Sequence, residues 1–342
     1  MRIALLTGGG DSPATNAAIR GVVKKAYADG HEVLGVRRGW AGMMESDMDI
    51  LDPSSVSGIL PRGGTVLGTS RTNPFKQDGG PEAIRRSVAD GCLDAVIAIG
   101  GDDTLGVAHK INRLDPPIPA VGIPQTIDND LDKTDFAIGF DTAVSIATDA
   151  LDKLHTTAES HHRIMVLEVM GRDAGHVALT AGLAGGADII LVPERQFNID
   201  AICDRIQKRR DMGKTFSLVI VAEGAMPEGG MQISKTEATD QFGHVILGGI
   251  GEYIGKTIHE NCELETRVTN LGHLQRGGTP TAFDRLLGTR FGVAAVGLVE
   301  AGEFDRMVAL QGSRVVAVDL GDALANIKPV DPDLLAMADI FY

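Results

Sequence analysis

The stretch that decides the fold is residues 1–36, MRIALLTGGGDSPATNAAIRGVVKKAYADGHEVLGV. Arg2–Leu6 is a short apolar run that predicts a strand, and His31–Val36 predicts a second one. Between them, small and apolar side chains recur near the helical period over Ala14–Asp29, which predicts a helix. A strand, a crossover helix and a following strand form the repeating unit of parallel sheets covered by helices. These residues therefore predict an α/β fold.

The same unit recurs along the rest of the chain. Asp94–Ile99 predicts a buried strand, followed by the turn GGDDT and a helix from about Leu105, and Ala120–Ile123 predicts the next strand. After Gly139 we predict helices at Thr142–Leu154, Gly175–Ala184, Ile199–Met212 and Pro280–Gly302, and strands at Arg163–Val169, Asp188–Val192, Ser217–Ala222 and Arg267–Leu274. The stretch 225–243 is typical of a surface loop. Because no linker-like composition separates the two series, we expect two sheets and a chain that crosses between domains more than once.

Composition excludes several classes of protein. The 342 residues suit one large domain or two modest ones. Lys and Arg total 32 against 46 Asp and Glu, a net charge of −14 that argues against nucleic-acid binding through a basic face. No apolar stretch approaches the roughly 18 residues that span a bilayer, and the N-terminus carries no signal-peptide core. We therefore expect no nucleic-acid partner, no membrane association and a cytoplasmic location.

The cysteines and histidines give no sign of a metal centre. Cys92, Cys203 and Cys262 are odd in number and widely spaced, with no C-x-x-C motif. We interpret them as free, buried thiols of a protein in a reducing compartment. The histidines form no H-x-H and no HExxH motif, so a zinc site has little support.

Polar clusters follow three of the predicted strands, where ligands bind in open parallel sheets. In Gly8–Asp11, backbone N–H groups at a helix start could receive a phosphate, and a tight turn is the alternative. This cluster lacks the G-x-G-x-x-G pattern, which disfavours a dinucleotide fold. In Gly100–Thr104, Asp102 and Asp103 suit a Mg²⁺ ligand with a selector beside it. The alternative there is a helix N-cap provided by Asp103 or Thr104.

The third cluster is Thr126–Asp130, with the sequence TIDND. Two carboxylates beside a hydroxyl suit a base that takes a proton from an alcohol near a metal-bound phosphate, and an Asx-turn is the alternative. Cations stand in turns or at element ends elsewhere in the chain: Arg71, Arg163, Arg172, Arg267, Arg276 and His273. The planar guanidinium of arginine suits bidentate phosphate binding. Together, the clusters and the cations predict a phosphoryl-transfer site.

A series of motifs stands in the order and spacing of a known family: LLTGGGDSPATNAAIRG, RGGTVLGTSR, AIGGDDT, PQTIDNDL, SHHRIMVLEVMGRDAGHVAL, VAEG and ETRVTNLGHLQRGGTPTAFDR. Over nearly its whole length, the chain resembles the 6-phosphofructokinases. The resemblance implies two similar three-layer α/β domains with mainly parallel sheets and an active site in the cleft between them. It also implies a phosphoryl-donor domain at 1–139 plus 275–325, and a sugar-phosphate-binding domain at 140–274 plus 326–342.

The resemblance further implies roles for individual residues. Asp128 would be the general base on the sugar's 1-hydroxyl, with Asp130 close by, and Asp102 would bind Mg²⁺. Thr126 and Arg172 would orient or stabilise the moving phosphoryl group. The donor would meet Gly10, Arg71, Asp103 and Gln125; the sugar would meet Met170, Gly171 and Glu223; and the 6-phosphate would meet His273 and Arg276, joined by Arg163 and Arg267 from a neighbouring subunit. Ligands from across an interface imply a homodimer or homotetramer with shared active sites.

Two positions bear on the phosphoryl donor. Family members that use ATP usually have glycine where this chain has Asp103, and an aspartate there is typical of the pyrophosphate-dependent branch. Gln125 is neither the glycine of the simple ATP enzymes nor the lysine usual in the pyrophosphate enzymes. A neutral amide donates hydrogen bonds but brings no charge to the donor.

The expected function is therefore Mg²⁺-dependent, reversible transfer of a phosphoryl group from pyrophosphate to fructose 6-phosphate, a step of glycolysis and gluconeogenesis. An ATP-dependent enzyme with the same acceptor is the alternative. A non-catalytic sugar-phosphate-binding subunit is disfavoured because TIDND and Asp102 are intact, and a lipid or NAD kinase is disfavoured by TIDND and GHLQRGG. Basic character remains at Arg20 and Lys24, but Pro53 and His155 replace arginines of the family's effector pocket, so we expect weak allosteric control or none.

Overall fold

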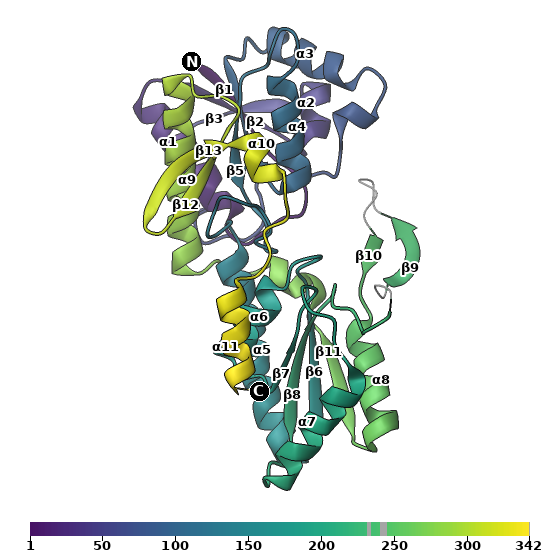
Figure 1. The fold of residues 1–342 in the computed structure, drawn as a ribbon. Coiled ribbons are helices and arrows are strands. Elements are labelled where there is room, and N and C mark those ends of the chain that lie inside the picture. The colour runs from purple at the N-terminus through teal and green to yellow at the C-terminus, as the bar shows by residue number, and fades with distance from the viewer. Residues whose placement is uncertain (231–233, 240–244, 342) are drawn as a thin grey trace. The chain divides into compact units, whose positions relative to one another are not determined.

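The computed structural model describes residues 1–230, 234–239 and 245–341 (Figure 1). The described residues divide into two compact units. Unit 1 comprises Met1–Ile127, Leu131–Thr142 and Arg276–Ile327, and unit 2 comprises Asp128–Asp130, Ala143–Gln275 and the described residues from Lys328 onward. We predicted divisions after residues 139, 274 and 325. That prediction did not assign Asp128–Asp130 to unit 2. The assignment of one unit to the donor and the other to the sugar stays a prediction.

The sheet of unit 1 has, among the described residues, seven strands in the order β13–β12–β5–β4–β1–β2–β3 (Figure 1). Its inner strands run parallel: β1 (Arg2–Thr7), β2 (Glu32–Val36), β4 (Ala95–Gly100), β5 (Ala120–Pro124) and β12 (Arg306–Gln311). The edge strands β3 (Met48–Leu51) and β13 (Arg314–Asp319) are antiparallel to their neighbours. Burial on both faces explains why the inner strands are nearly continuous apolar runs.

Helices cover both faces of this sheet, because successive strand side chains point to opposite sides. Ile3 and Leu5 lie in the core beneath α1 (Thr15–Ala28) and α9 (Ala282–Ala301), whereas Ala4 and Leu6 lie in the core on the other face. The helices of that second face are α2 (Gly39–Glu45), α3 (Gly80–Asp90), α4 (Asp102–Asn112) and α10 (Leu320–Leu324), and a short 3₁₀ helix, Pro74–Lys76, precedes α3. Unit 1 is therefore a three-layer α/β domain.

The main sheet of unit 2 has four described strands in the order β11–β6–β8–β7, all parallel (Figure 1). Their bounds are β6 (Ile164–Val169), β7 (Ile189–Leu191), β8 (Ser217–Ala222) and β11 (Thr266–Asn270). Apolar side chains of α7 (Ile199–Asp211) and α8 (Ile250–Cys262) form one core with the strands, and α6 (His176–Ala184) packs on β7 and β8. The long helix α5 (Phe140–His161) begins in unit 1 and continues in unit 2, and α11 (Pro332–Phe341) packs on α6. The predicted α/β class with mainly parallel sheets is confirmed.

Three details of the predictions were wrong. The predicted strand Arg267–Leu274 ends at Asn270, and Gly272–Arg276 forms a 3₁₀ turn instead. The stretch 225–243, predicted to be a loop, contains β9 (Ser234–Thr239), which pairs with β10 (Val245–Leu247); residues 231–233 and 240–243 lie outside the described residues.

The third correction concerns the cysteines. Cys203 of α7 and Cys262 of α8 form a disulfide, and Cys92 is exposed, so none of them is a free buried thiol. Because α7 and α8 pack side by side, they bring together two cysteines that are 59 residues apart in the chain. In the described part of the chain, no helix has the length and apolar character needed to cross a membrane.

Candidate active site

The two glycine-rich clusters and the start of the third, Gln125 and Thr126, meet at one edge of the unit 1 sheet. They follow β1, β4 and β5, which are neighbours in the sheet and end on the same side. Gly8 N donates to Ile99 O at 3.0 Å, and Gln125 N donates to Gly100 O at 3.0 Å. The turns that follow the three strands are therefore joined by main-chain hydrogen bonds, as expected where parallel strands end together.

Glycines let these turns approach one another closely. A Cβ atom on Gly8 would lie 2.6 Å from Thr104 Oγ1, and one on Gly10 would lie 2.4 Å from Nη1 of Arg276. The Arg276 guanidinium also donates to Asp11 O at 3.2 Å. A side chain at either glycine would displace its neighbour, so the bare backbone and the Arg276 cation lie together at this edge. Arg276 thus belongs to unit 1 and contacts the loop Gly8–Asp11, whereas His273 belongs to unit 2.

Gln125 is buried against the same loop. Its side chain is 2% exposed, and Nε2 donates to Gly10 O at 3.0 Å. The amide therefore fixes the direction of the Gly10 carbonyl and, with it, the loop whose N–H groups we predict to bind phosphate. This contact is a structural role for Gln125 that the sequence did not reveal.

A second segment, Thr69–Arg71, is attached to the loop Gly8–Asp11. Thr69 Oγ1 donates to Gly9 O at 2.6 Å, and Gly9 N donates to Ser70 O at 3.1 Å. These bonds place the backbone of Arg71, whose side chain is exposed, next to the loop that contains Gly10. The sequence pointed to Arg71 but not to Thr69 and Ser70, although Ser and Thr side chains commonly hydrogen-bond to nearby backbone groups.

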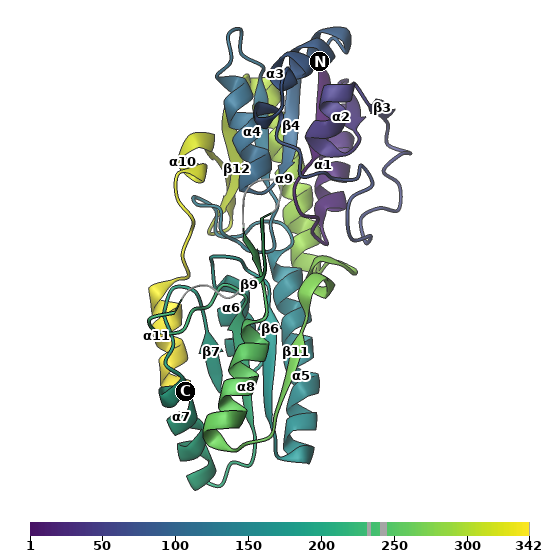
Figure 2. The same ribbon diagram turned by 90° about the vertical axis from the view of Figure 1, so that its right-hand side faces the viewer.

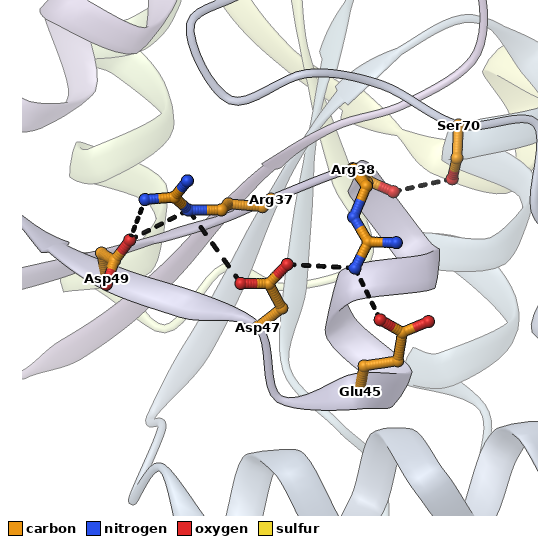
Figure 3. Close-up of polar contacts among 6 residues, drawn as sticks. All are labelled: Arg37, Arg38, Glu45, Asp47, Asp49 and Ser70. Atoms are coloured by element: carbon orange, nitrogen blue, oxygen red, sulfur yellow. Dashed lines mark hydrogen bonds and ion pairs between the residues drawn. The ribbon is translucent and has the colours of Figure 1, made fainter.

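Figure 3 shows the polar contacts that hold the segment Thr69–Arg71 in place through Ser70. Ser70 Oγ donates to Arg38 O at 2.7 Å, and the Arg38 guanidinium pairs with Glu45 at 2.6 Å and Asp47 at 3.0 Å. Arg37 pairs with Asp49 in the same way. These acids raise the pKa values of both arginines through hydrogen bonds and charge attraction. Because acids of the same segment balance their charges, we interpret Arg37 and Arg38 as residues that support the loop.

The two acids of the GGDDT turn begin helix α4. Asp102 is exposed and Asp103 is partly buried, both in the first helical turn. The N-cap position falls on Gly101, so the alternative in which Asp103 or Thr104 is the N-cap is wrong. The described residues contain no group of three or more acidic, histidine or cysteine side chains arranged to hold a metal ion. A single accessible carboxylate nevertheless fits Mg²⁺, which keeps several waters and is bound by one or two carboxylates plus substrate phosphates.

The TIDND segment is buried. Thr126 is 9% exposed and Asp128 is 5% exposed, and Asn129 has a left-handed backbone with φ of 54°. Thr126 belongs to unit 1 and Asp128–Asp130 to unit 2. A left-handed asparagine in a buried turn is a sparsely populated conformation that the surrounding structure must hold, and such residues concentrate at functional sites.

The residues predicted to line the sugar meet at one edge of the unit 2 sheet. Met170–Arg172 follow β6, Glu223 follows β8, and His273 lies in the turn after β11. Arg172 N donates to Glu223 Oε1 at 3.2 Å, and Glu223 N donates to Val169 O at 2.8 Å. Arg172 is also left-handed, with φ of 50°. Unit 2 therefore gathers these predicted residues where its parallel strands end.

Arg163 and Arg267 lie at the opposite edge of that sheet. Arg163 directly precedes β6, so the whole strand separates it from Met170, about 23 Å for seven residues at roughly 3.3 Å each. Glu265 binds both arginines, with 2.8 Å to Arg163 and 2.5 Å to Arg267. The Arg163 guanidinium, with Arg267 nearby, lowers the pKa of this carboxyl. Neither arginine lies at the edge that carries Met170, Glu223 and His273 of the same chain.

Comparison with known proteins shows the family to which this chain belongs. Residues 2–299 match the protein family described as phosphofructokinase. The chain is 53% identical to the pyrophosphate–fructose 6-phosphate 1-phosphotransferase of Amycolatopsis methanolica, over 100% of both chains. It is also 48% identical to the ATP-dependent 6-phosphofructokinase of Corynebacterium efficiens, over 100% of this chain and 99% of the other. Among solved structures, phosphofructokinase from Pichia pastoris in the T-state matches with a TM-score of 0.86 and 30% identity, covering 99% of this chain and 36% of that one.

Proposed function

Since the chain belongs to the phosphofructokinase family, we propose that it transfers a phosphoryl group from pyrophosphate to the 1-hydroxyl of fructose 6-phosphate. The products are fructose 1,6-bisphosphate and phosphate, and the reaction runs in both directions. The observation that carries the choice of donor is Asp103, a partly buried carboxylate in the first turn of α4 beside the loop Gly8–Asp11. The test is a direct assay of purified protein with fructose 6-phosphate, Mg²⁺ and either pyrophosphate or ATP.

In the proposed mechanism, Asp128 takes the proton of the 1-hydroxyl as that oxygen attacks the donor's terminal phosphorus. The bond from phosphorus to the bridging oxygen breaks, and phosphate leaves. Burial of Asp128 keeps water away from the reacting oxygen, and Thr126 and Arg172 steady the moving phosphoryl group. Mg²⁺, held by Asp102, supplies neutralising charge when bound.

On the donor side, backbone N–H groups near Gly10 and the cation of Arg71 bind the phosphates. The hydrogen bonds from Gln125 to Gly10, and between Ser70 and Gly9, support this assignment because they fix both elements before the donor arrives. The guanidinium of Arg276 lies on the same loop, so we extend its proposed role from the 6-phosphate to the region of the transferred group.

On the acceptor side, Met170, Gly171 and Glu223 line the sugar, Asp130 lies near Asp128, and His273 binds the 6-phosphate. Arg163 and Arg267 complete that phosphate site from a neighbouring subunit. Arg163 lies about 23 Å from Met170, and Arg267 lies at the same far edge of the sheet, which supports sharing between subunits. We therefore propose a homodimer or homotetramer whose active sites need two chains.

We also propose a cytoplasmic location and a role in glycolysis, in keeping with a sugar-phosphate substrate. The predicted free thiols were one argument for that location. Because Cys203 and Cys262 form a disulfide, the cysteines no longer support it. The ATP-dependent alternative has its own support, since one relative at 48% identity is described as ATP-dependent and Gln125 brings no positive charge to the donor.

The shared phosphate site predicts a selective defect. Arg163→Ala and Arg267→Ala should each raise KM for fructose 6-phosphate by roughly tenfold to a hundredfold, because a charge-assisted hydrogen bond contributes about 1.5–3 kcal/mol. KM for pyrophosphate should stay within about twofold. Lys256→Ala, which removes an exposed cation of α8, is the matched control and should change neither constant.

Mixed oligomers test the sharing itself. Subunits that carry Arg163→Ala, combined with subunits that carry Asp128→Asn, should regain part of the activity because some sites then combine two intact halves. Absence of recovery in oligomers shown to be mixed would argue that each chain builds its own site.

The position of Gln125 beside Gly10 predicts that a lysine there raises the rate with pyrophosphate. Gln125→Lys should raise kcat with pyrophosphate several-fold and change KM little, because an ammonium can still donate to Gly10 O and adds charge that stabilises the transition state. Gln125→Met keeps the bulk but removes the donor, so it should lower kcat. Steady-state kinetics with pyrophosphate measure both, and a lysine variant slower than the methionine variant would contradict the proposal.

A further inference from the structure

The C-terminal segment of the chain contacts the proposed catalytic loop within unit 2. Lys328 N donates to Asp130 O at 2.8 Å, two residues after the proposed base Asp128. The carbonyl of the same residue, Lys328 O, accepts a hydrogen bond from His176 Nε2 at 3.0 Å. One main-chain residue therefore links the start of α6 to the end of the TIDND segment.

Further contacts hold this segment in place. Val330 N donates to Glu194 Oε1 at 3.1 Å, and Arg195 pairs with Asp339 of α11 at 2.9 Å. Helix α11 packs on α6, and both views show the two helices together (Figures 1 and 2). The segment that follows Lys328 is thus anchored at Val330 and at α11, close beyond the bond to Asp130.

The protonation state of His176 suits its hydrogen bond to Lys328 O. Burial lowers the pKa of its imidazole, Lys328 lowers it further, and the Lys328 carbonyl and Glu194 oppose the shift. The neutral ring predominates near pH 7, and it has one N–H donor. Because a carbonyl oxygen only accepts, Nε2 carries that hydrogen, and His176 fixes the orientation of Lys328 O.

The loop that receives this contact needs support. Asn129, between Asp128 and Asp130, has the left-handed backbone, a conformation that costs about 1 kcal/mol or more and persists only when neighbours hold it. A hydrogen bond to the carbonyl of the next residue opposes rotation of this turn. A rotation there would move the carboxylate of Asp128 relative to the sugar hydroxyl.

We propose that the main chain of Lys328, oriented by His176, is a positioning element for the catalytic base Asp128. The inference rests on the proposed role of Asp128 and adds a C-terminal element to it. The Lys328 side chain takes no part in the two hydrogen bonds, so they carry no signal in the sequence.

Two pairs of variants test the proposal. Lys328→Pro deletes the N–H group that binds Asp130 O, and Lys328→Ala keeps it. We expect Lys328→Pro to lower kcat about fivefold to tenfold or more, the equivalent of one lost positioning hydrogen bond, with both KM values within about twofold. Lys328→Ala removes the ammonium near His176 but keeps both main-chain hydrogen bonds, so its kcat should fall clearly less than that of Lys328→Pro. Equal kcat for the two variants would overturn the proposal.

The second pair does not alter the backbone and decides the matter if the proline variant fails to fold. His176→Leu removes the donor to Lys328 O, and His176→Gln supplies an amide donor in its place. A kcat lowered in the leucine variant and recovered in the glutamine variant, at equal melting temperatures, supports positioning. Equal activity of the leucine, glutamine and wild-type proteins counts against it.

The proposed function is tested separately by the wild-type donor assay and by Asp128→Asn. If the wild type uses ATP instead of pyrophosphate, the same four variants are measured with ATP. The prediction for Lys328 is then unchanged, because it concerns the base and not the donor.

Discussion

Asp128→Asn is expected to lower kcat by about 10²–10⁴, the usual contribution of a general base, with KM for fructose 6-phosphate nearly unchanged. Asparagine has the same shape as aspartate but cannot take the proton of the 1-hydroxyl at any working pH. Asp128 is only 5% exposed, so bulk water has little access to replace its carboxylate as the proton acceptor.

Asp130→Asn is the matched control for this prediction. It makes the same chemical change two residues away, and its main-chain carbonyl still accepts the hydrogen bond from Lys328. We expect a loss at least tenfold smaller than for Asp128→Asn. Similar losses in the two variants, or an Asp128→Asn enzyme within a few-fold of wild type, would assign the proton transfer to another group.

Much of the fold could be predicted because its inner strands are buried on both faces. Ser217–Ala222 is a strand with the predicted bounds, and Arg2–Leu6 extends by one residue, to Thr7. The hairpin of β12 and β13 was missed although its signal was present. Two apolar runs flank the turn at Gly312, whose φ of 59° suits a tight hairpin.

The candidate site likewise has features that the sequence predicts and features that it does not. Residues that follow neighbouring strands could be predicted to converge, because a parallel sheet ends all its strands at one edge. Contacts made by main-chain atoms, or between helices that are far apart in the sequence, could not be predicted. Lys328 acts through its backbone, and Cys203 meets Cys262 only because α7 packs on α8.

The second large effect concerns the donor. With saturating Mg²⁺, wild-type protein should turn over with pyrophosphate and at least a hundredfold more slowly with ATP. Asp103 lies in the first turn of α4 at the edge that we propose binds the donor, where the α-phosphate of ATP would add a like charge. Two like charges about 4 Å apart cost on the order of 4 kcal/mol at an effective dielectric constant of 20, roughly a thousandfold in rate. Pyrophosphate ends before that point and escapes the repulsion.

Two substitutions separate charge from volume at this position. Asp103→Asn removes the charge and keeps the shape, whereas Asp103→Gly removes both. If charge excludes ATP, both variants should gain ATP activity to a similar extent; if volume excludes it, only the glycine variant should. Asp102→Asn is not a suitable control, since loss of the proposed Mg²⁺ ligand should slow the reaction with either donor. Wild-type protein that uses ATP and ignores pyrophosphate would overturn the argument from Asp103. Gln125 would then be the better indicator of the donor. A neutral amide at this position is compatible with ATP, whose use does not depend on a lysine there.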